Sequence, residues 1–215
     1  MGAMTTATPP EASTDAGTRP DAGTATPFPR ALPWLMIVAG VVGLVASFVL
    51  TVEKFALAAD ATYVPSCSID AVVNCGSVMG SAQSAVFGFP NSLLGIIGFT
   101  AVLASGAAVL SGARFGRWYW AGLQVGLTAA VVFVHWLMFQ SLYVIGALCP
   151  YCMAVWVSTV TVFWFVTLRT LHHGVFSRPV SARALTAPVN AVVPPVAWLV
   201  AVGALVFYRF GAFWA

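Results

Sequence analysis

Apolar residues along this chain gather in five long runs, unlike the short alternating groups of a water-soluble fold. Each run has about the 20 residues that an α-helix needs to cross the hydrocarbon core of a bilayer. A single segment buried in lipid must satisfy its backbone groups internally, and a helix does so. The pattern therefore predicts an all-α membrane protein with five transmembrane helices, at residues 31–52, 91–111, 118–140, 149–168 and 189–210.

The longest polar connection, residues 53–90, begins with charged residues and ends with small residues interleaved with Val, Met and Phe. Its second half, from Val78, is too polar and too often interrupted to span a membrane. A short amphipathic helix lying on the membrane face fits this composition better. Gly88 and Pro90 are expected to end that helix before the second span.

The composition supports lipid as the surrounding solvent. Apolar residues make up 60% of the chain and charged residues only 7%, whereas a soluble domain carries roughly 25% charged residues. So few charges cannot cover a water-facing surface. The net charge of +3 is small and scattered, which argues against nucleic acid as a partner.

Basic residues predict the orientation, because cytoplasmic loops are enriched in Lys and Arg. With the N-terminus inside and the C-terminus outside, only Lys54 and Arg209 among the nine basic residues lie on the outer side. The other seven are cytoplasmic, namely Arg19, Arg30, Arg114, Arg117, Arg169, Arg178 and Arg183.

This topology divides the chain into four parts. Residues 1–30 lack hydrophobic periodicity and are expected to form a disordered cytoplasmic tail. Residues 31–170 hold the first four spans and the outer loop 53–90. Residues 171–188 form a cytoplasmic loop, and residues 189–215 form the fifth helix with a short outer tail.

All four cysteines fall on the outer side in this topology. Cys67 and Cys75 lie in the long outer loop, and Cys149 and Cys152 open the fourth span. Pro150 suits the first turn of a helix, where free backbone N–H groups and the helix dipole stabilise a thiolate. Two thiols three residues apart can close and reopen a small disulfide, so this pair is suited to redox cycling.

Two other interpretations of the cysteines stay open on the sequence alone. Cys67 and Cys75 are equally suited to a structural disulfide, which outer compartments favour. A four-cysteine zinc site is the second alternative, although the spacing of Cys67 and Cys75 is not the tight spacing of zinc ligands.

Several motifs, taken together and in this order, resemble those of the vitamin K epoxide reductase family, in particular its bacterial homologues. The resemblance covers about residues 31–170. It rests on the pair Cys67 and Cys75, on Ser77 and Ser81, on the segment Phe-Gly-Phe-Pro-Asn-Ser-Leu-Leu-Gly at 87–95, and on Cys149-Pro-Tyr-Cys152.

The resemblance implies a four-helix bundle around a quinone of the menaquinone or ubiquinone type. It implies that Cys67 meets an outer partner, that Cys75 relays electrons to Cys149, and that Cys152 faces the quinone ring. Ser81, Asn91 and Trp156 match positions near the quinone, where Asn91 would bond a carbonyl. Asn91 is also suited to cap the second span.

Two departures from the family accompany this resemblance. Many bacterial members continue into an outer thioredoxin-like domain, and this chain stops at Ala215, so a separate thioredoxin-fold, DsbA-like partner is expected. Trp156 stands where the family often has Tyr, whose hydroxyl would donate to the ring. His135 is a further candidate for the quinone site, because ionisable residues inside a membrane are often functional.

The expected function is a membrane thiol oxidoreductase that reoxidises the outer partner and reduces the membrane quinone pool, supporting disulfide formation in a bacterial cell membrane. One alternative is quinone or quinone-epoxide recycling with electrons from thiols. A second is a non-enzymatic membrane protein with structural disulfides. The DsbB type of quinone oxidase is disfavoured because its Cys-x-x-Cys pair precedes the spaced pair. A transporter is disfavoured because the spans carry almost no charge.

Overall fold

The computed structural model describes residues 31–60, 62–176 and 188–214, with side chains described for 31–60, 62–176 and 191–211. The predicted tail 1–30 and most of the predicted loop 171–188 lie outside the described residues. Five helices within the described residues are long and apolar enough to cross a membrane. They are α1 (Ala31–Ala59), α3 (Ser92–Leu110), α4 (Arg117–Phe139), α5 (Pro150–His172) and α7 (Pro188–Trp214). The prediction of five spanning helices is confirmed.

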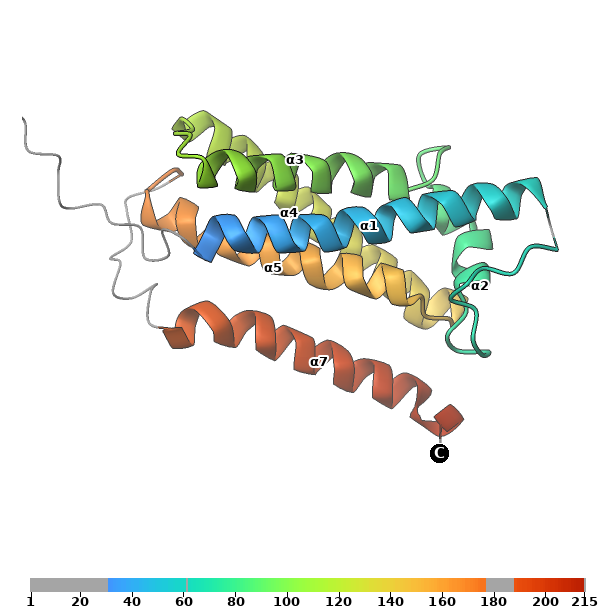
Figure 1. Ribbon diagram of the computed structural model, residues 1–215. Coiled ribbons are helices and arrows are strands. Elements are labelled where there is room, and N and C mark those ends of the chain that lie inside the picture. The colour runs from blue at the N-terminus through green and yellow to red at the C-terminus, as the bar shows by residue number, and fades with distance from the viewer. Residues whose placement is uncertain (1–30, 61, 177–187, 215) are drawn as a thin grey trace, which may run out of the picture.

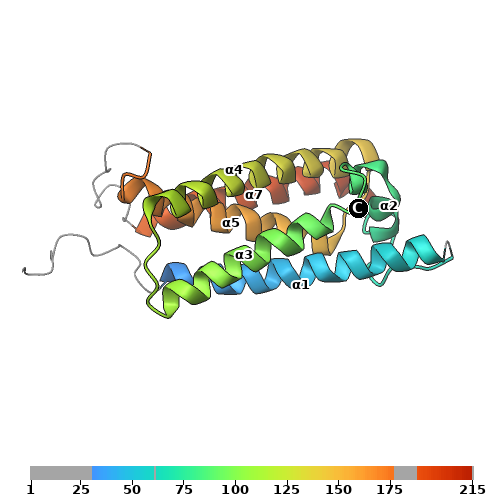
Figure 2. The ribbon, with the colours of Figure 1, turned by 90° about the horizontal axis from the view of Figure 1, so that it is seen from above.

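Helices α1, α3, α4 and α5 lie side by side, and α7 runs along the outside of this group (Figures 1 and 2). Two hydrogen bonds tie α7 to the others. Trp164 Nε1 donates to the carbonyl of Ala191 at 3.0 Å, and Trp198 Nε1 donates to His135 Nε2 at 2.9 Å. One apolar core lies between α1, α3, α4 and α5. Helix α7 packs on one side of the group and buries Val206 and Phe210 in a second core with Val134 and Trp156.

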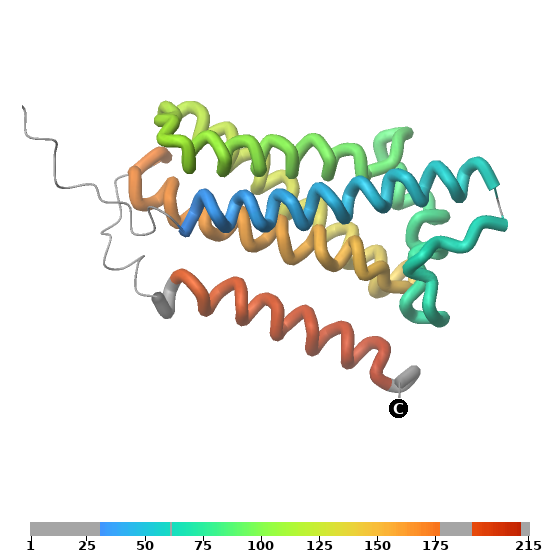
Figure 3. Tube along the Cα trace, viewed as in Figure 1, coloured from blue at the N-terminus to red at the C-terminus, as the bar shows by residue number. Residues whose placement is uncertain are grey.

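Helix α1 is longer than the sequence pattern predicts. It ends at Ala59 rather than near residue 52, so Glu53 and Lys54 are helical and not part of a loop. The segment after Val52 consists of Glu, Lys, Leu, Phe and Ala, most of which favour helix. At 29 residues the helix exceeds the roughly 20 needed for the bilayer core. Its last turns therefore protrude beside the outer loop, as the trace in Figure 3 shows.

The predicted short helix of the outer loop is present, but it begins before Val78 and ends at Gly80, not at Gly88 and Pro90 as expected. Helix α2 spans Cys75–Gly80, and a 3-10 turn, η1, spans Ala82–Ala85. Asn74 is the N-cap of α2, since its side-chain oxygen accepts a hydrogen bond from the N–H of Ser77 at 2.9 Å.

At the end of α4 the chain continues into a π-helical turn, Gln140–Ile145, and leaves it through Gly146 at a φ of 70°.

Close packing of α1 against α3 depends on glycine. A Cβ at Gly106 would lie 2.9 Å from Met36 Cβ and 3.0 Å from the Pro33 carbonyl oxygen. Small residues allow membrane helices to approach in this way, and packing then replaces the missing hydrophobic driving force.

Replacing Gly106 by Leu is therefore expected to destabilise the bundle by roughly 1–3 kcal/mol. Thermal unfolding of the detergent-solubilised protein measures the effect. Gly203→Leu is the matched control, because a Cβ at Gly203 meets nothing within 4 Å. Equal melting temperatures for the two variants would contradict the packing role of Gly106.

Candidate redox site

A disulfide joins Cys67 and Cys75 at the end of the bundle that carries α2. Cys75 is the first residue of α2 and is fully buried, and Cys67 is 6% exposed. Ser68 secures the loop between them, because its hydroxyl oxygen accepts a hydrogen bond from the N–H of Gly76 at 3.2 Å. The two loop cysteines thus pair with each other, as expected.

The second cysteine pair, Cys149 and Cys152, lies next to this disulfide. Cys149 is the N-cap of α5, Pro150 is the first helical residue, and both Cys149 and Cys152 are free thiols. The sulfur of Cys149 lies 3.0 Å from the sulfur of Cys75. Thiol–disulfide exchange requires this kind of approach of one sulfur to another, so electrons can pass between the two pairs without a large movement.

A short backbone clamp holds the two sulfurs together. The N–H of Leu148 donates to the carbonyl of Val72 at 2.7 Å, and the N–H of Asn74 donates to the carbonyl of Leu148 at 3.0 Å. Val73 and Leu148 form an isolated parallel bridge. Because these residues directly precede Cys75 and Cys149, the clamp fixes the distance between them.

The pKa of the Cys149 thiol, which lies just before the first residue of α5, is lowered. A hydrogen bond from the Cys152 thiol lowers the pKa of Cys149, and the backbone N–H groups of Cys152 and Tyr151 lower it further. Burial and the charge of Glu53 oppose this shift. The net lowering favours a thiolate at Cys149, the form that attacks or leaves in exchange reactions.

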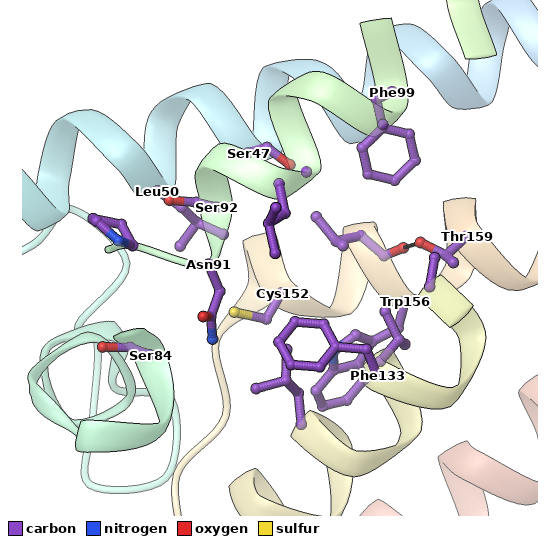
Figure 4. Close-up of a pocket in the computed structure, with 18 of the residues that line it drawn as sticks. Ser47, Leu50, Ser84, Asn91, Ser92, Phe99, Phe133, Cys152, Trp156 and Thr159 are labelled. Carbon is purple, nitrogen blue, oxygen red and sulfur yellow. Dashed lines mark hydrogen bonds between the residues drawn. The ribbon is translucent and has the colours of Figure 1, made fainter. Parts of the chain in front are cut away.

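A cavity of about 640 Å³ opens beside Cys152. It lies between α1, α3, α4, α5 and the outer loop, and its walls are mainly apolar. Figure 4 shows Cys152 between Asn91 on one side and the rings of Phe133 and Trp156 on the other, with its sulfur pointing toward the Asn91 amide. The volume lies in the range of about 300–1,000 Å³ of small-molecule sites.

Three of the four residues predicted at the quinone site line this cavity, namely Ser81, Asn91 and Trp156. Asn91 stands at the N-cap position of α3, but its side chain makes no capping hydrogen bond there. Its amide nitrogen donates to the Gln83 carbonyl at 2.7 Å, and its side-chain oxygen accepts from the N–H of Val86 at 3.1 Å. Since the amide has two hydrogens, one remains for a molecule in the cavity.

His135 is not brought into the cavity. Its Nδ1 lies 2.8 Å from the carbonyl oxygen of Val131, and its Nε2 accepts the hydrogen bond from Trp198 of α7. The side chain thus leaves α4 toward α7 and does not line the cavity beside Cys152, where the predicted quinone contact would lie. In this structure it helps to attach the fifth helix.

Two residues of the site were missed in the sequence because they were assigned to a loop. Lys54 lines the cavity, and its amine donates to the Met79 carbonyl and, at 2.9 Å, to the Ser84 hydroxyl. Glu53 lies against Cys67 and is 5% exposed. The sequence did contain a signal for both residues. Glu53 and Lys54 follow the first apolar run directly, and the residues after them favour helix, so the helix could have been extended through both.

Three sulfurs, those of Cys67, Cys75 and Cys149, lie within 4.8 Å of one another. Zinc requires cysteine thiolates as ligands, whereas Cys67 and Cys75 are bonded to each other. The cluster in this state has the geometry of an exchange site and not that of a metal site.

The comparisons with known proteins agree with this geometry. The model of the vitamin K epoxide reductase family matches residues 34–167, which include all four cysteines and most of the bundle. Comparison with curated proteins gave no similar sequence. Members of this family are quinone-reducing thiol oxidoreductases. The chain, a multi-pass membrane protein, therefore belongs to the vitamin K epoxide reductase family.

Proposed function

We propose that this protein oxidises a thioredoxin-fold, DsbA-like dithiol protein on the outer side of a bacterial cell membrane and passes the electrons to a membrane quinone. The distance of 3.0 Å between the Cys75 and Cys149 sulfurs carries the proposal. It connects a disulfide at the outer face with a thiol pair whose second member, Cys152, lines an apolar cavity.

The first exchange takes place at the loop disulfide. A thiolate of the partner attacks the Cys67 sulfur, and Cys75 leaves as a thiolate. The second thiol of the partner then displaces Cys67, so the partner leaves with a disulfide and the loop pair is reduced. Val64 and Ile69, which are 70% and 76% exposed, flank Cys67 and supply an apolar surface for a protein partner.

The second exchange passes two electrons inward. The Cys75 thiolate attacks Cys149 in a Cys149–Cys152 disulfide, and Cys152 leaves as a thiolate. Cys67 then attacks Cys75, which closes the loop disulfide and releases Cys149 as a thiolate. The result is a loop disulfide above two free inner thiols, and this is the state that the structure contains.

The cavity suits a quinone. A quinone accepts two electrons and two protons and becomes a quinol. The remaining amide hydrogen of Asn91 can bond a carbonyl, the rings of Phe133 and Trp156 can pack against the ring, and the apolar walls can hold the tail. When the inner thiols give up their electrons, Cys149 and Cys152 form their disulfide again.

The proposed orientation places the cysteines outside and the N-terminus inside. Arg114 and Arg117 lie in and after the connection between α3 and α4, at the opposite end of the bundle from the cysteines (Figure 1). Arg117 donates to the Gly174 carbonyl at 2.6 Å, so the end of α5 is at this end too. Basic residues are enriched on the cytoplasmic side.

Quinol formation tests the proposed function. The purified protein in detergent receives dithiothreitol as the electron donor and either a short-chain benzoquinone or a short-chain naphthoquinone. Quinol is expected to form much faster than in the protein-free reaction. If the protein accelerates reduction of neither quinone, the proposed function is wrong.

Replacing Gly126 by Leu is expected to block the quinone and leave the disulfide chemistry intact. Gly126 lines the cavity, and a Cβ there meets nothing within 4 Å, so the added side chain occupies space that the quinone needs. The KM for the quinone is expected to rise about 10-fold or more, because the quinone loses apolar contacts with the cavity wall. The rate at which dithiothreitol opens the Cys67–Cys75 disulfide is the internal control, and an unchanged KM would contradict this position for the quinone.

A further inference from the structure

Glu53 is a buried carboxyl group near the outer end of the largely apolar helix α1. Only 5% of its surface is exposed, and no ion pair with a basic side chain accompanies it among the described residues. Burial of such a group is costly unless hydrogen bonds compensate for lost water. Its contacts therefore indicate what it does.

Both oxygens of Glu53 are directed at the segment that carries Cys67. Oε1 accepts hydrogen bonds from the N–H of Ser66, at 3.1 Å, and from the Ser66 hydroxyl. Oε2 lies 3.7 Å from the Cys67 sulfur. The first oxygen is thus anchored to the backbone, and the second is left facing a reacting atom.

The contact between Oε2 and the sulfur can hold one proton. While Cys67 is in the disulfide its sulfur has no hydrogen, so a proton in this contact belongs to the carboxyl group. Once the disulfide opens, the Cys67 thiol carries a hydrogen that the Glu53 carboxylate can accept. One proton can therefore move between the Cys67 sulfur and Glu53 Oε2 as the disulfide opens and closes.

We propose that Glu53 is the proton acceptor and donor of Cys67 in the exchange reactions of the loop disulfide, an inference that rests on the proposed function. When the loop closes, the Glu53 carboxylate takes the proton of the Cys67 thiol and the sulfur attacks Cys75. The Cys67–Cys75 bond forms, the Cys75–Cys149 bond breaks, and Cys149 leaves as a thiolate. When the partner opens the loop, Glu53 returns the proton to the departing Cys67 sulfur, and the partner's second thiol releases its own proton to water.

Other titratable groups near Glu53 are the inner cysteine Cys149 and the neighbouring lysine of α1. Among described groups, Cys67 and Cys149 are the titratable ones that face Glu53, while the amine of Lys54 is directed to Met79 and Ser84.

The lifetime of the Cys75–Cys149 mixed disulfide tests the proposal. Fully reduced wild-type protein and Glu53→Gln are oxidised with one equivalent of diamide or of a short-chain naphthoquinone, over a series of pH values. Samples are quenched with N-ethylmaleimide and mapped by non-reducing peptide mass spectrometry. The mixed disulfide with a free Cys67 is expected to persist in Glu53→Gln on the order of 10²-fold longer at neutral pH, and the difference is expected to shrink as alkaline solvent removes the proton.

Three variants serve as controls. Asp60→Asn removes an exposed carboxylate directly after α1 that, within the described residues, accepts hydrogen bonds from Thr62. This variant is expected to match the wild type. Cys67→Ser cannot form the Cys67–Cys75 disulfide, so it is expected to accumulate the largest amount of the Cys75–Cys149 mixed disulfide. Glu53→Asp keeps the acid one methylene further from the sulfur, so its mixed disulfide is expected to have an intermediate lifetime.

A mixed disulfide that resolves in Glu53→Gln as fast as in wild type, or faster, overturns the proposal. Loss of a negative charge eases ionisation of Cys67, so a purely electrostatic role predicts faster closure, the opposite of the expected result. The diamide reaction reports on exchange among the cysteines whether or not the protein reduces quinones. A Glu53 effect with diamide but no quinol formation in the wild type would refute the proposed function and leave the role of Glu53 standing.

Discussion

Cys152→Ala is expected to lose quinol formation, with a fall in turnover of roughly three orders of magnitude or more, as when the nucleophile of a catalytic unit is removed. Cys152 is the one cysteine among the described residues that lines the cavity. Without it the inner pair cannot form a disulfide, so two electrons cannot leave through it. Steady-state quinol formation with dithiothreitol measures the loss.

Cys152→Ser is the matched control for packing, because it keeps the shape of the side chain and replaces only the redox-active sulfur by oxygen. It is expected to be as inactive as Cys152→Ala, and both variants should retain the Cys67–Cys75 disulfide. Turnover near the wild-type rate in either variant would mean that electrons reach the quinone by another route.

Cys75→Ser is expected to separate the outer pair from the inner one. The sulfur of Cys75 lies 3.0 Å from that of Cys149, and Cys149 is fully buried, so a bulky donor has no other path inward. Turnover with a thioredoxin-fold donor is expected to fall by roughly three orders of magnitude. A reduced sample of this variant should still convert one quinone with its inner pair.

A comparison of Cys75→Ser with Cys67→Ser shows which of the two loop cysteines exchanges with Cys149. Both variants lose the loop disulfide and therefore share its loss of stability, roughly 2–3 kcal/mol for a short loop. In Cys67→Ser the Cys75–Cys149 mixed disulfide is expected to accumulate, whereas Cys75→Ser cannot form it. Accumulation of a Cys67–Cys149 disulfide in Cys75→Ser, with retained turnover, would contradict the assigned order.

The local features of the site follow from sequence. Runs of about 20 apolar residues define a membrane span because the bilayer thickness sets the length. Pro150 after Cys149 marks a helix start because proline lacks the N–H that a helix interior needs. The five helices and the place of Cys149 at the N-cap of α5 were therefore predictable.

Features that depend on contacts between distant segments were not predictable in this way. The bridge between Val73 and Leu148 joins residues far apart in the chain, and neither has a sequence signal for it. The direction of His135 depends on how α4 is rotated against α7, which the nearly uniform apolar composition of both helices does not define. Glu53 was missed because its charge suggested the end of a span, whereas the contact with Cys67 keeps it buried.

The central claim is that both cysteine pairs deliver electrons to one quinone site. The most direct measurement is the amount of quinol produced per chain by fully reduced wild-type protein, freed of dithiothreitol and mixed anaerobically with excess short-chain quinone. The chain has four cysteines, which form two disulfides, and each disulfide releases two electrons, so two quinols per chain are expected. One quinol per chain would show that the loop pair is not connected to the quinone, and none would contradict the account as a whole.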